Sequence, residues 1–209
     1  MQVIEIFKSL QGEGLHIGSP TAFVRFAGCN LECDWCDTKY AWEGGKERSS
    51  NEIFADVIAM STRHVCITGG EPLLQIGISR LINRFLANGN QVTLETNGTQ
   101  SLEDMPCDPR LTISMDVKCP SSKMDGKTLD ANFEVLGPTD QLKFVIANQE
   151  DYNFARGILK AHKVGCEIIF TPVGGTNMKW LAEAVLKDKL DVRVLPQLHK
   201  LIWGDERGR

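Results

Sequence analysis

The chain has 209 residues, 42% of them hydrophobic and 24% charged, an ordinary globular balance that excludes collagen-like, disordered and coiled-coil chains. Its 23 basic and 27 acidic residues leave a net charge of −4, which argues against a nucleic-acid-binding protein. No apolar run reaches the roughly 18 residues that span a bilayer, and no signal peptide is present, so we expect no membrane contact and a cytoplasmic location. The length favours a single domain over 1–209.

Apolar stretches alternate with amphipathic ones along the chain. Helices are predicted from the capping box of Ser49 and Glu52 to about residue 60, then over 72–86, 151–161 and 176–188, and the polar segment 116–137 is expected to be a long connection. The predicted strands are 3–7, 22–26, 64–68, 91–95, 111–115, 141–146, 167–171 and 191–195.

This alternation predicts an α/β fold with a parallel sheet, either a barrel or a doubly wound sheet. Because 209 residues fall short of the roughly 250 of a complete eight-stranded barrel, we expect a partial (open) TIM-like barrel with about six core parallel strands. In such a fold, functional groups lie at the carboxyl ends of the strands.

Seven cysteines are present, and without an export signal we expect reduced thiols. Cys29, Cys33 and Cys36 form a C-x3-C-x2-C pattern directly after a predicted strand. One loop with three thiolates suits zinc or iron–sulfur, and the lack of a second cysteine pair favours a cluster with an open iron over a closed zinc site. The other cysteines have no ligand spacing: Cys66, Cys107, Cys119 and Cys166.

With Trp35 just before its last cysteine, this loop resembles that of the radical S-adenosylmethionine (SAM) superfamily. The resemblance implies that Cys29, Cys33 and Cys36 bind a [4Fe–4S] cluster whose fourth iron is chelated by the amino and carboxylate groups of SAM. An electron from the cluster then cleaves the sulfonium to a deoxyadenosyl radical. Taken alone, Trp35 is better interpreted as a ring packed over the loop.

Several strand ends carry polar or glycine-rich turns, the first being Thr68-Gly69-Gly70-Glu71-Pro72. Paired glycines allow close approach of a ligand to the backbone, and Glu71 is suited to accept from an ammonium group. Each turn alone is an ordinary connection, but in the superfamily these strand ends contact SAM. The cofactor-binding residues that the resemblance implies are Trp35, Cys36, Asp37, Gly70, Glu71, Asn97, Ser114, Asp116, Lys118 and Val173.

Further motifs lie toward the two ends of the chain: residues 5–14, which include Gln11-Gly12-Glu13-Gly14, residues 23–31, Cys36-Asp37-Thr38 and Pro196-Gln197-Leu198-His199-Lys200. Together they carry a similarity to the 7-carboxy-7-deazaguanine synthase family. It implies a lyase that converts 6-carboxy-5,6,7,8-tetrahydropterin to 7-carboxy-7-deazaguanine with loss of ammonia, in queuosine- or archaeosine-type deazapurine biosynthesis.

The same similarity implies roles for residues of the substrate site. Arg25 would clamp the substrate carboxylate through a bidentate pair, and Thr38 would offer its hydroxyl to Mg²⁺. From the residues alone, Arg25 could instead pair with a carboxylate inside the barrel, and Thr38 could cap a helix. The implied substrate-binding residues are Leu10, Gln11, Gly12, Glu13, Arg25, Thr68 and His199.

The implied partners are a small pterin, a flavodoxin or ferredoxin as reductant and a second copy in a homodimer, with no nucleic acid. The tail 204–209 is expected to be extended, which makes contact between it and the substrate doubtful. Two alternatives remain open. One is a glycyl-radical activating enzyme of the same superfamily, with a flat groove for a protein substrate, and the other is a zinc-stabilised binding module.

Overall fold

The computed structural model describes residues 1–209, which form one nine-stranded sheet of order β3-β1-β2-β4-β5-β6-β7-β8-β9. Strand β2 and the strands from β4 to β9 pair in parallel, whereas β1 and β3 pair antiparallel at one edge of the sheet. The strands are β1 (Gln2–Leu10), β2 (Pro20–Phe26), β3 (Lys46–Glu47), β4 (His64–Gly69), β5 (Gln91–Thr96), β6 (Leu111–Val117), β7 (Gln141–Ile146), β8 (Glu167–Pro172) and β9 (Arg193–Val194).

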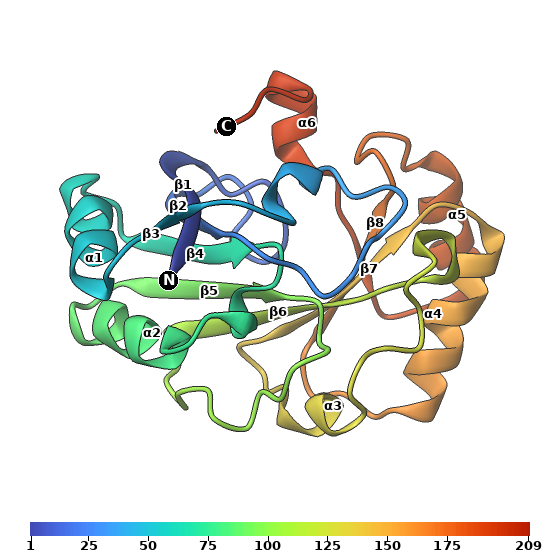
Figure 1. The fold of residues 1–209 in the computed structure, drawn as a ribbon. Helices are drawn as coiled ribbons and strands as arrows, with labels where there is room; N and C mark the ends of the chain where they lie inside the picture. The colour runs from blue at the N-terminus through green and yellow to red at the C-terminus, as the bar shows by residue number, and fades with distance from the viewer.

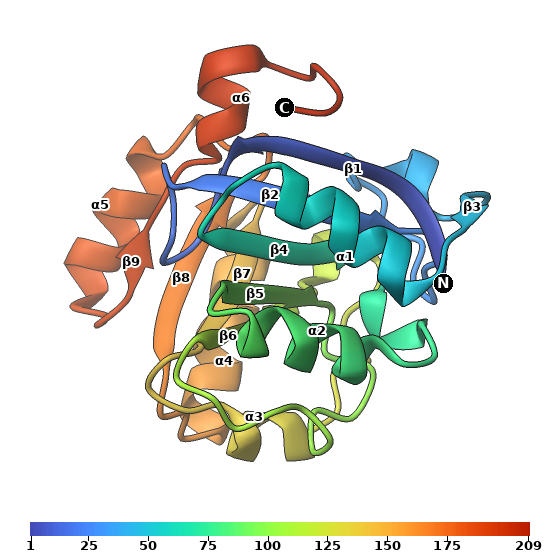
Figure 2. The ribbon, with the colours of Figure 1, turned by 90° about the vertical axis from the view of Figure 1, so that its left-hand side faces the viewer.

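Helices cover the outer face of this curved sheet. Figure 2 shows α1 and α2 in front of β4 and β5, and Figure 1 shows α4 and α5 beside β7 and β8. None of the helices is long and apolar enough to cross a membrane. The helices are α1 (Ser50–Ala59), α2 (Ile78–Ala87), α3 (Ala131–Val135), α4 (Gln149–Ala161), α5 (Lys179–Asp188) and α6 (Leu198–Trp203), with 3-10 turns η1 (Lys39–Ala41), η2 (Pro72–Leu74) and η3 (Pro120–Ser122).

The expected partial barrel is confirmed, with six long parallel strands and the two-residue β9. The sheet does not close, because β3 and β9 are its two edges. Across the gap, Leu198 N donates to Gly12 O at 2.8 Å, while Gln197 N, on the β9 side, donates to Gly175 O after β8 at 3.0 Å. The β1–β2 loop and the segment before α6 therefore meet where further strands would complete a barrel.

Most predicted elements are present, but one predicted helix begins later than expected. The capping box at α1 is confirmed, since Glu52 N donates to Ser49 Oγ and Ser49 N to Glu52 Oε2. The stretch 72–86 instead divides into η2 and α2, because Gly77 adopts a φ of 85° that a continuous helix does not allow. The segment 116–137 also holds more structure than expected, namely the end of β6, η3 and the short α3.

The two faces of the sheet differ in polarity. Leu142, Phe144 and Ile146 of β7 belong to the main apolar core, whereas Gln141 and Lys143 alternate with them and face the barrel interior. Buried polar residues recur on the other strands, among them Thr68 on β4 and Ser114 on β6. The apolar core thus lies between sheet and helices, and the inside of the barrel is lined with groups able to hold a polar ligand.

Candidate active site

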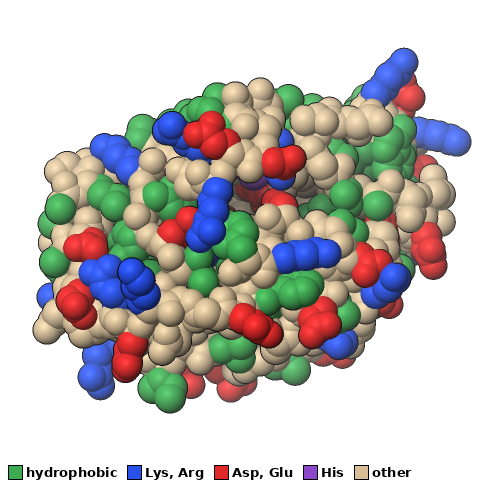
Figure 3. All heavy atoms as spheres, turned by 45° about the horizontal axis from the view of Figure 1, so that its top comes forward, with side chains coloured by type: hydrophobic (Ala, Val, Ile, Leu, Met, Phe, Trp, Pro, Cys, Tyr) green, Lys and Arg blue, Asp and Glu red, His purple; other side chains and the backbone are tan.

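A cavity of about 600 Å³ opens at the carboxyl ends of the strands, next to α6. Figure 3, with the top of Figure 1 turned forward, shows this hollow with acidic atoms in its depth and basic side chains around it. Every predicted site residue except Glu71 lines it: Leu10, Gln11, Gly12, Glu13, Arg25, Cys29, Cys33, Trp35, Cys36, Asp37, Thr38, Thr68, Gly70, Asn97, Ser114, Asp116, Lys118, Val173 and His199.

The cysteine loop between β2 and η1 holds its three thiols along one wall of the cavity. All seven thiols of the chain are free, and only Cys29, Cys33 and Cys36 line this cavity. No three His, Cys, Asp or Glu side chains converge closely enough to hold one metal ion. The cavity offers three thiols and no fourth, which is the ligand set that leaves one iron of a cluster open.

Lys118 supplies positive charge next to these thiols. Burial raises the pKa of Cys33 to about 11, and Asp116 adds to the rise, while the Lys118 ammonium opposes it. The Lys118 Nζ lies 2.9 Å from Asp116 Oδ2 and 5.6 Å from the centre of the Trp35 ring. Because metal binding requires deprotonated thiols, a nearby ammonium favours the ligated form of the loop.

Trp35 is held by a chain of hydrogen bonds that ends at a buried carboxylate. Its indole N–H donates to Ser121 Oγ at 3.0 Å, and Ser121 in turn donates to the Asp151 carboxylate at the start of α4. Asp151 is fully buried and also accepts from Ala147 N. The ring is therefore oriented by hydrogen bonding as well as packed over the loop.

Gly69 and Gly70 let the end of β4 touch the cysteine loop. A Cβ on Gly70 would lie 2.1 Å from Gly28 O and 2.9 Å from Cys29 Cβ. Gly70 N donates to Phe26 O, and the next amide donates to Gly28 O. Because the obstructing atoms are mostly backbone, no side chain can move aside to make room.

Gly70→Ala should lower the free energy of unfolding by about 1–3 kcal/mol, because the added methyl group overlaps the Gly28 carbonyl. Gly157→Ala is the matched control, since Gly157 lies exposed within α4 with open space around it. That change should raise stability by about 0.5–1 kcal/mol through helix propensity. Urea unfolding measures both, and equal effects of the two substitutions would contradict the steric argument.

Glu71 departs from its expected place. Its carboxylate is fully buried, does not line the cavity, and accepts from Asn97 N at 2.7 Å, Leu73 N at 3.0 Å and the Thr96 hydroxyl at 3.0 Å. Burial raises its pKa, although these donors oppose the rise. The Glu71 oxygens, which the sequence suggested would accept from an ammonium group, accept from the protein's own backbone and hydroxyl groups instead. Glu71 therefore stabilises the turn that carries Asn97.

The strand ends on the cluster side also fit SAM. Asp116 Oδ1 is buried in the cavity wall and has no hydrogen-bond partner. Asn97 Nδ2 donates to Asn30 Oδ1 at 3.1 Å, so the β5 turn is tied to the cysteine loop. A buried acceptor such as Asp116 Oδ1 needs a hydrogen-bond donor, and SAM carries hydroxyl and ammonium donors. The three thiols, the glycine turn and the free Asp116 oxygen therefore suit a cluster with SAM beside it.

The opposite half of the cavity is formed by the β1–β2 loop and the inner faces of β4, β5 and β7. Glu95 Oε2 accepts from Thr68 Oγ1 at 2.8 Å and Glu95 Oε1 lies 3.5 Å from Gln11 Nε2. Glu13 accepts from Lys143 Nζ and, at 2.5 Å, from Gln197 Nε2. This half is rich in acceptors and lies within the same cavity as the thiols.

Arg25 both lines the cavity and pairs with an internal carboxylate. Its Nε lies 2.9 Å from Glu5 Oε1, which also accepts from the Tyr40 hydroxyl at 2.9 Å. The pairing considered from the sequence is therefore present. It uses only Nε, so the terminal N–H groups of the guanidinium remain for a ligand.

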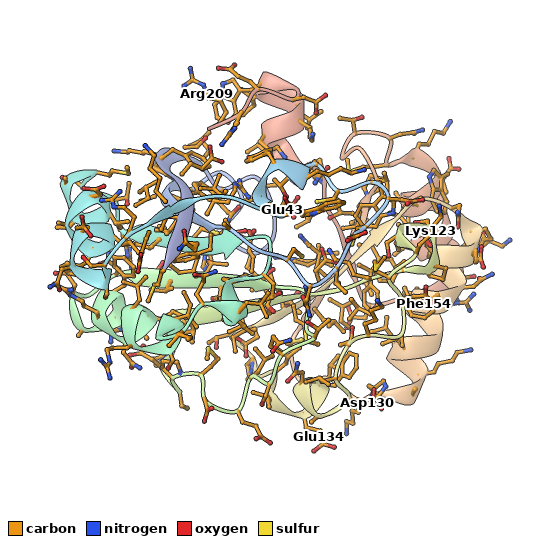
Figure 4. The ribbon with its side chains drawn as sticks, in the orientation of Figure 1. Glu43, Lys123, Asp130, Glu134, Phe154 and Arg209 are labelled. Carbon is orange, nitrogen blue, oxygen red and sulfur yellow. The ribbon has the colours of Figure 1, made fainter.

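The C-terminal segment 204–209 lines the cavity instead of extending away from it. Arg207 Nε lies 3.1 Å from Glu5 Oε2, and its guanidinium lies 4.0 Å from the centre of the Tyr40 ring. Figure 4 places Arg209 on the same side as α6. A cation over an aromatic face explains why this polar segment folds back.

Some cavity residues were missed by the sequence interpretation. Lys143 stands between apolar neighbours in the β7 stretch QLKFVI, and a charge at an inward position of a strand is a usable signal. Tyr40 and Arg207 carry no such signal, because loop contacts bring them to the cavity. The missed side chains that bear on the site are Tyr40, Glu95, Lys143, Gln197 and Arg207.

A three-cysteine loop at the carboxyl ends of a partial parallel barrel defines a radical SAM enzyme, and residues 23–186 match the family model described as the Radical SAM superfamily. The chain is 42% identical to a 7-carboxy-7-deazaguanine synthase of Methanospirillum hungatei over 97% of this chain and 85% of that protein. It is 40% identical to one of Thermoplasma acidophilum over all of both chains. The crystal structure of QueE from Escherichia coli superposes with a TM-score of 0.77 at 25% identity, covering 95% of this chain and 94% of that one.

The chain belongs to the 7-carboxy-7-deazaguanine synthase family of radical SAM lyases. This assignment carries with it a [4Fe–4S] cluster and SAM. It supports neither the activating-enzyme alternative nor the zinc module.

Proposed function

We propose that residues 1–209 act as one domain that converts 6-carboxy-5,6,7,8-tetrahydropterin to 7-carboxy-7-deazaguanine with loss of ammonia, for queuosine- or archaeosine-type deazapurines. The observation that carries the proposal is the single cavity, in which the thiol wall and the acceptor-rich half face the same space. A substrate held by the second half lies within reach of chemistry started at the first. Substrate and product differ by one ammonia, so the conversion needs no external oxidant.

Arg25 is the proposed clamp for the substrate carboxylate. Its Nε is engaged by Glu5, which fixes the plane of the guanidinium and directs the terminal N–H groups. Two parallel N–H donors match the two oxygens of a carboxylate, and a lysine ammonium lacks that fork. His199 lines the cavity beside Gly12, close to the β1–β2 loop.

The N–H groups of the pterin ring require acceptors, and this half of the cavity supplies them. Glu13 and Glu95 present carboxylates, and Gln11 and Thr68 form hydrogen bonds with Glu95. Leu10 and Gly12 contribute backbone from the same loop. When bound, the cluster and SAM supply the one-electron chemistry that begins the ring contraction. The protein orients the ring and shields it from water.

The decisive experiment is anaerobic incubation of the reconstituted protein with SAM, a reductant and carboxytetrahydropterin, followed by product analysis. We expect 7-carboxy-7-deazaguanine and one ammonia per turnover. Consumption of the pterin only at the background rate would overturn the proposal and favour an activating enzyme with a protein substrate.

We also propose that Thr38 contributes a hydroxyl ligand to Mg²⁺. Although Thr38 precedes η1, its side chain makes no cap hydrogen bond, and it faces the cavity 3.6 Å from Cys36 Sγ. Mg²⁺ commonly keeps water and substrate oxygens as its other ligands, so a single protein hydroxyl is compatible with such a site. A cation there would orient the substrate and stabilise negative charge.

Thr38→Ala should therefore lower turnover and weaken its dependence on Mg²⁺ while SAM cleavage persists. Thr176→Ala is a matched control, because Thr176 is exposed and does not line the cavity. Turnover measured against magnesium concentration distinguishes the two. A Thr38→Ala protein with the magnesium dependence of the wild type would refute the role.

We further propose a flavodoxin or ferredoxin as the electron donor and a homodimer as the working assembly. The position of the cysteine loop at the cavity wall supports the proposed electron donor, because a one-electron donor must approach the cluster. Sedimentation velocity tests the proposed homodimer.

A further inference from the structure

Lys143 is a buried lysine with no role in the binding and chemistry proposed above. It stands in the middle of β7 with only 8% of its surface exposed, and its side chain faces the cavity. Lysine is almost never buried without a partner, because removing an ammonium from water is costly. Its partners therefore indicate what it does.

The Lys143 ammonium joins the two halves of the cavity. It donates to Glu13 Oε2 on the β1–β2 loop and lies 3.5 Å from Asp116 Oδ2 on β6. Asp116 Oδ2 also accepts from Lys118, 2.9 Å away and beside the cysteine loop. The row Glu13, Lys143, Asp116, Lys118 alternates in charge and runs from the proposed pterin half to the SAM half.

Glu13 is kept as a carboxylate by this row. Burial alone would raise the pKa of Glu13, but the Lys143 ammonium, aided by Gln197, holds the pKa down to about 2. The other groups that face this pair are His199 on α6, Asp116 on β6 and Glu95 on β5. An ionised carboxylate offers about four acceptor positions, of which Lys143 and Gln197 occupy two.

Adjacent N–H groups on the pyrimidine edge of a pterin match such an acceptor. A carboxylate accepts two parallel N–H bonds, whereas a protonated carboxyl group replaces one acceptor with a donor and loses the match. Resting on the proposed function, we propose that Lys143 is a positioning residue for the pterin, which keeps Glu13 an acceptor for the ring N–H groups and ties it to Asp116 on the SAM side.

The test is equilibrium binding of 6-carboxypterin, an unreactive analogue, to reconstituted holoenzyme with SAM, from pH 7 down to about pH 5. Lys143→Met should bind it about 10- to 100-fold more weakly at neutral pH, and more weakly still as the pH falls, because Glu13 then gains a proton. Lys143→Arg should restore most of the affinity. Lys187→Met, at an exposed lysine of α5, should match the wild type.

The other side chains of the cavity are the same in Lys143→Met and in the wild type, so the ratio of the two affinities at each pH isolates the effect on Glu13. Glu13→Gln with Lys143→Met removes both charges and should fold and bind SAM, with weak pterin binding whose ratio to wild type does not vary with pH. Wild-type affinity with a constant ratio in Lys143→Met would overturn the inference. Failure of the wild type itself to bind or convert the pterin would instead overturn the proposed function.

Discussion

Cys33→Ser should abolish the iron–sulfur absorbance of the reconstituted protein and reduce turnover to background. Cys33 lies between the other two ligands on the loop and is 6% exposed, and no fourth cysteine lines the cavity to replace it. A serine hydroxyl is a harder and far less acidic ligand than a thiol, so it does not hold iron in its place. Iron and sulfide per chain, the visible spectrum and product formation measure the loss.

Cys107→Ser is the matched control. Cys107 is exposed and does not line the cavity, so its substitution should leave iron content and turnover unchanged. A Cys33→Ser protein that kept its full iron content and its turnover would refute the ligand assignment. Colourless wild-type protein with about one zinc per chain would restore the zinc-module alternative.

Glu71→Ala should produce the largest loss of stability outside the cluster. The substitution leaves the Asn97 and Leu73 amides and the Thr96 hydroxyl without an acceptor in a fully buried place. Each buried donor left unsatisfied costs about 1–3 kcal/mol, so a fall of several kcal/mol in the free energy of unfolding is expected. The turn at Asn97 should also loosen, which calorimetry of SAM binding would detect as lower affinity.

Glu134→Ala provides the comparison, because Glu134 is an exposed carboxylate on α3 (Figure 4) and should change stability little. The pH dependence gives a second test through Glu71→Gln, which cannot titrate. Because burial raises the folded-state pKa of Glu71, its stabilising contribution is complete below the ordinary value of 4.5 and is lost as pH rises through the raised value. The stability advantage of wild type over Glu71→Gln should therefore shrink with rising pH, and an advantage that grew would contradict the assigned shift.

Sequence patterns predicted correctly the helices and strands that are set by interactions between residues close together in the chain. The Ser49 and Glu52 box started α1 as expected, since both hydrogen bonds of the box lie within four residues. The helix predicted over 72–86 is confirmed from residue 78 but wrong in its first six residues, because Gly77, which has no Cβ, adopts a positive φ that apolar spacing does not reveal. The role of Glu71 was likewise beyond local reasoning, because its partners Thr96 and Asn97 lie 25 and 26 residues away.

The sequence by itself determined the chemistry this protein can support. Three thiols on one loop and polar turns at the strand ends are properties of neighbouring residues, and parallel strands bring those turns to one end. Only the tertiary structure decided which partner each charged side chain binds. Glu71 accepts from the backbone of the Asn97 turn, Arg25 pairs with Glu5, and Lys143 lies between Glu13 and Asp116. The physical reason is that a buried charge must find a partner, and which partner lies near depends on the packing of distant segments.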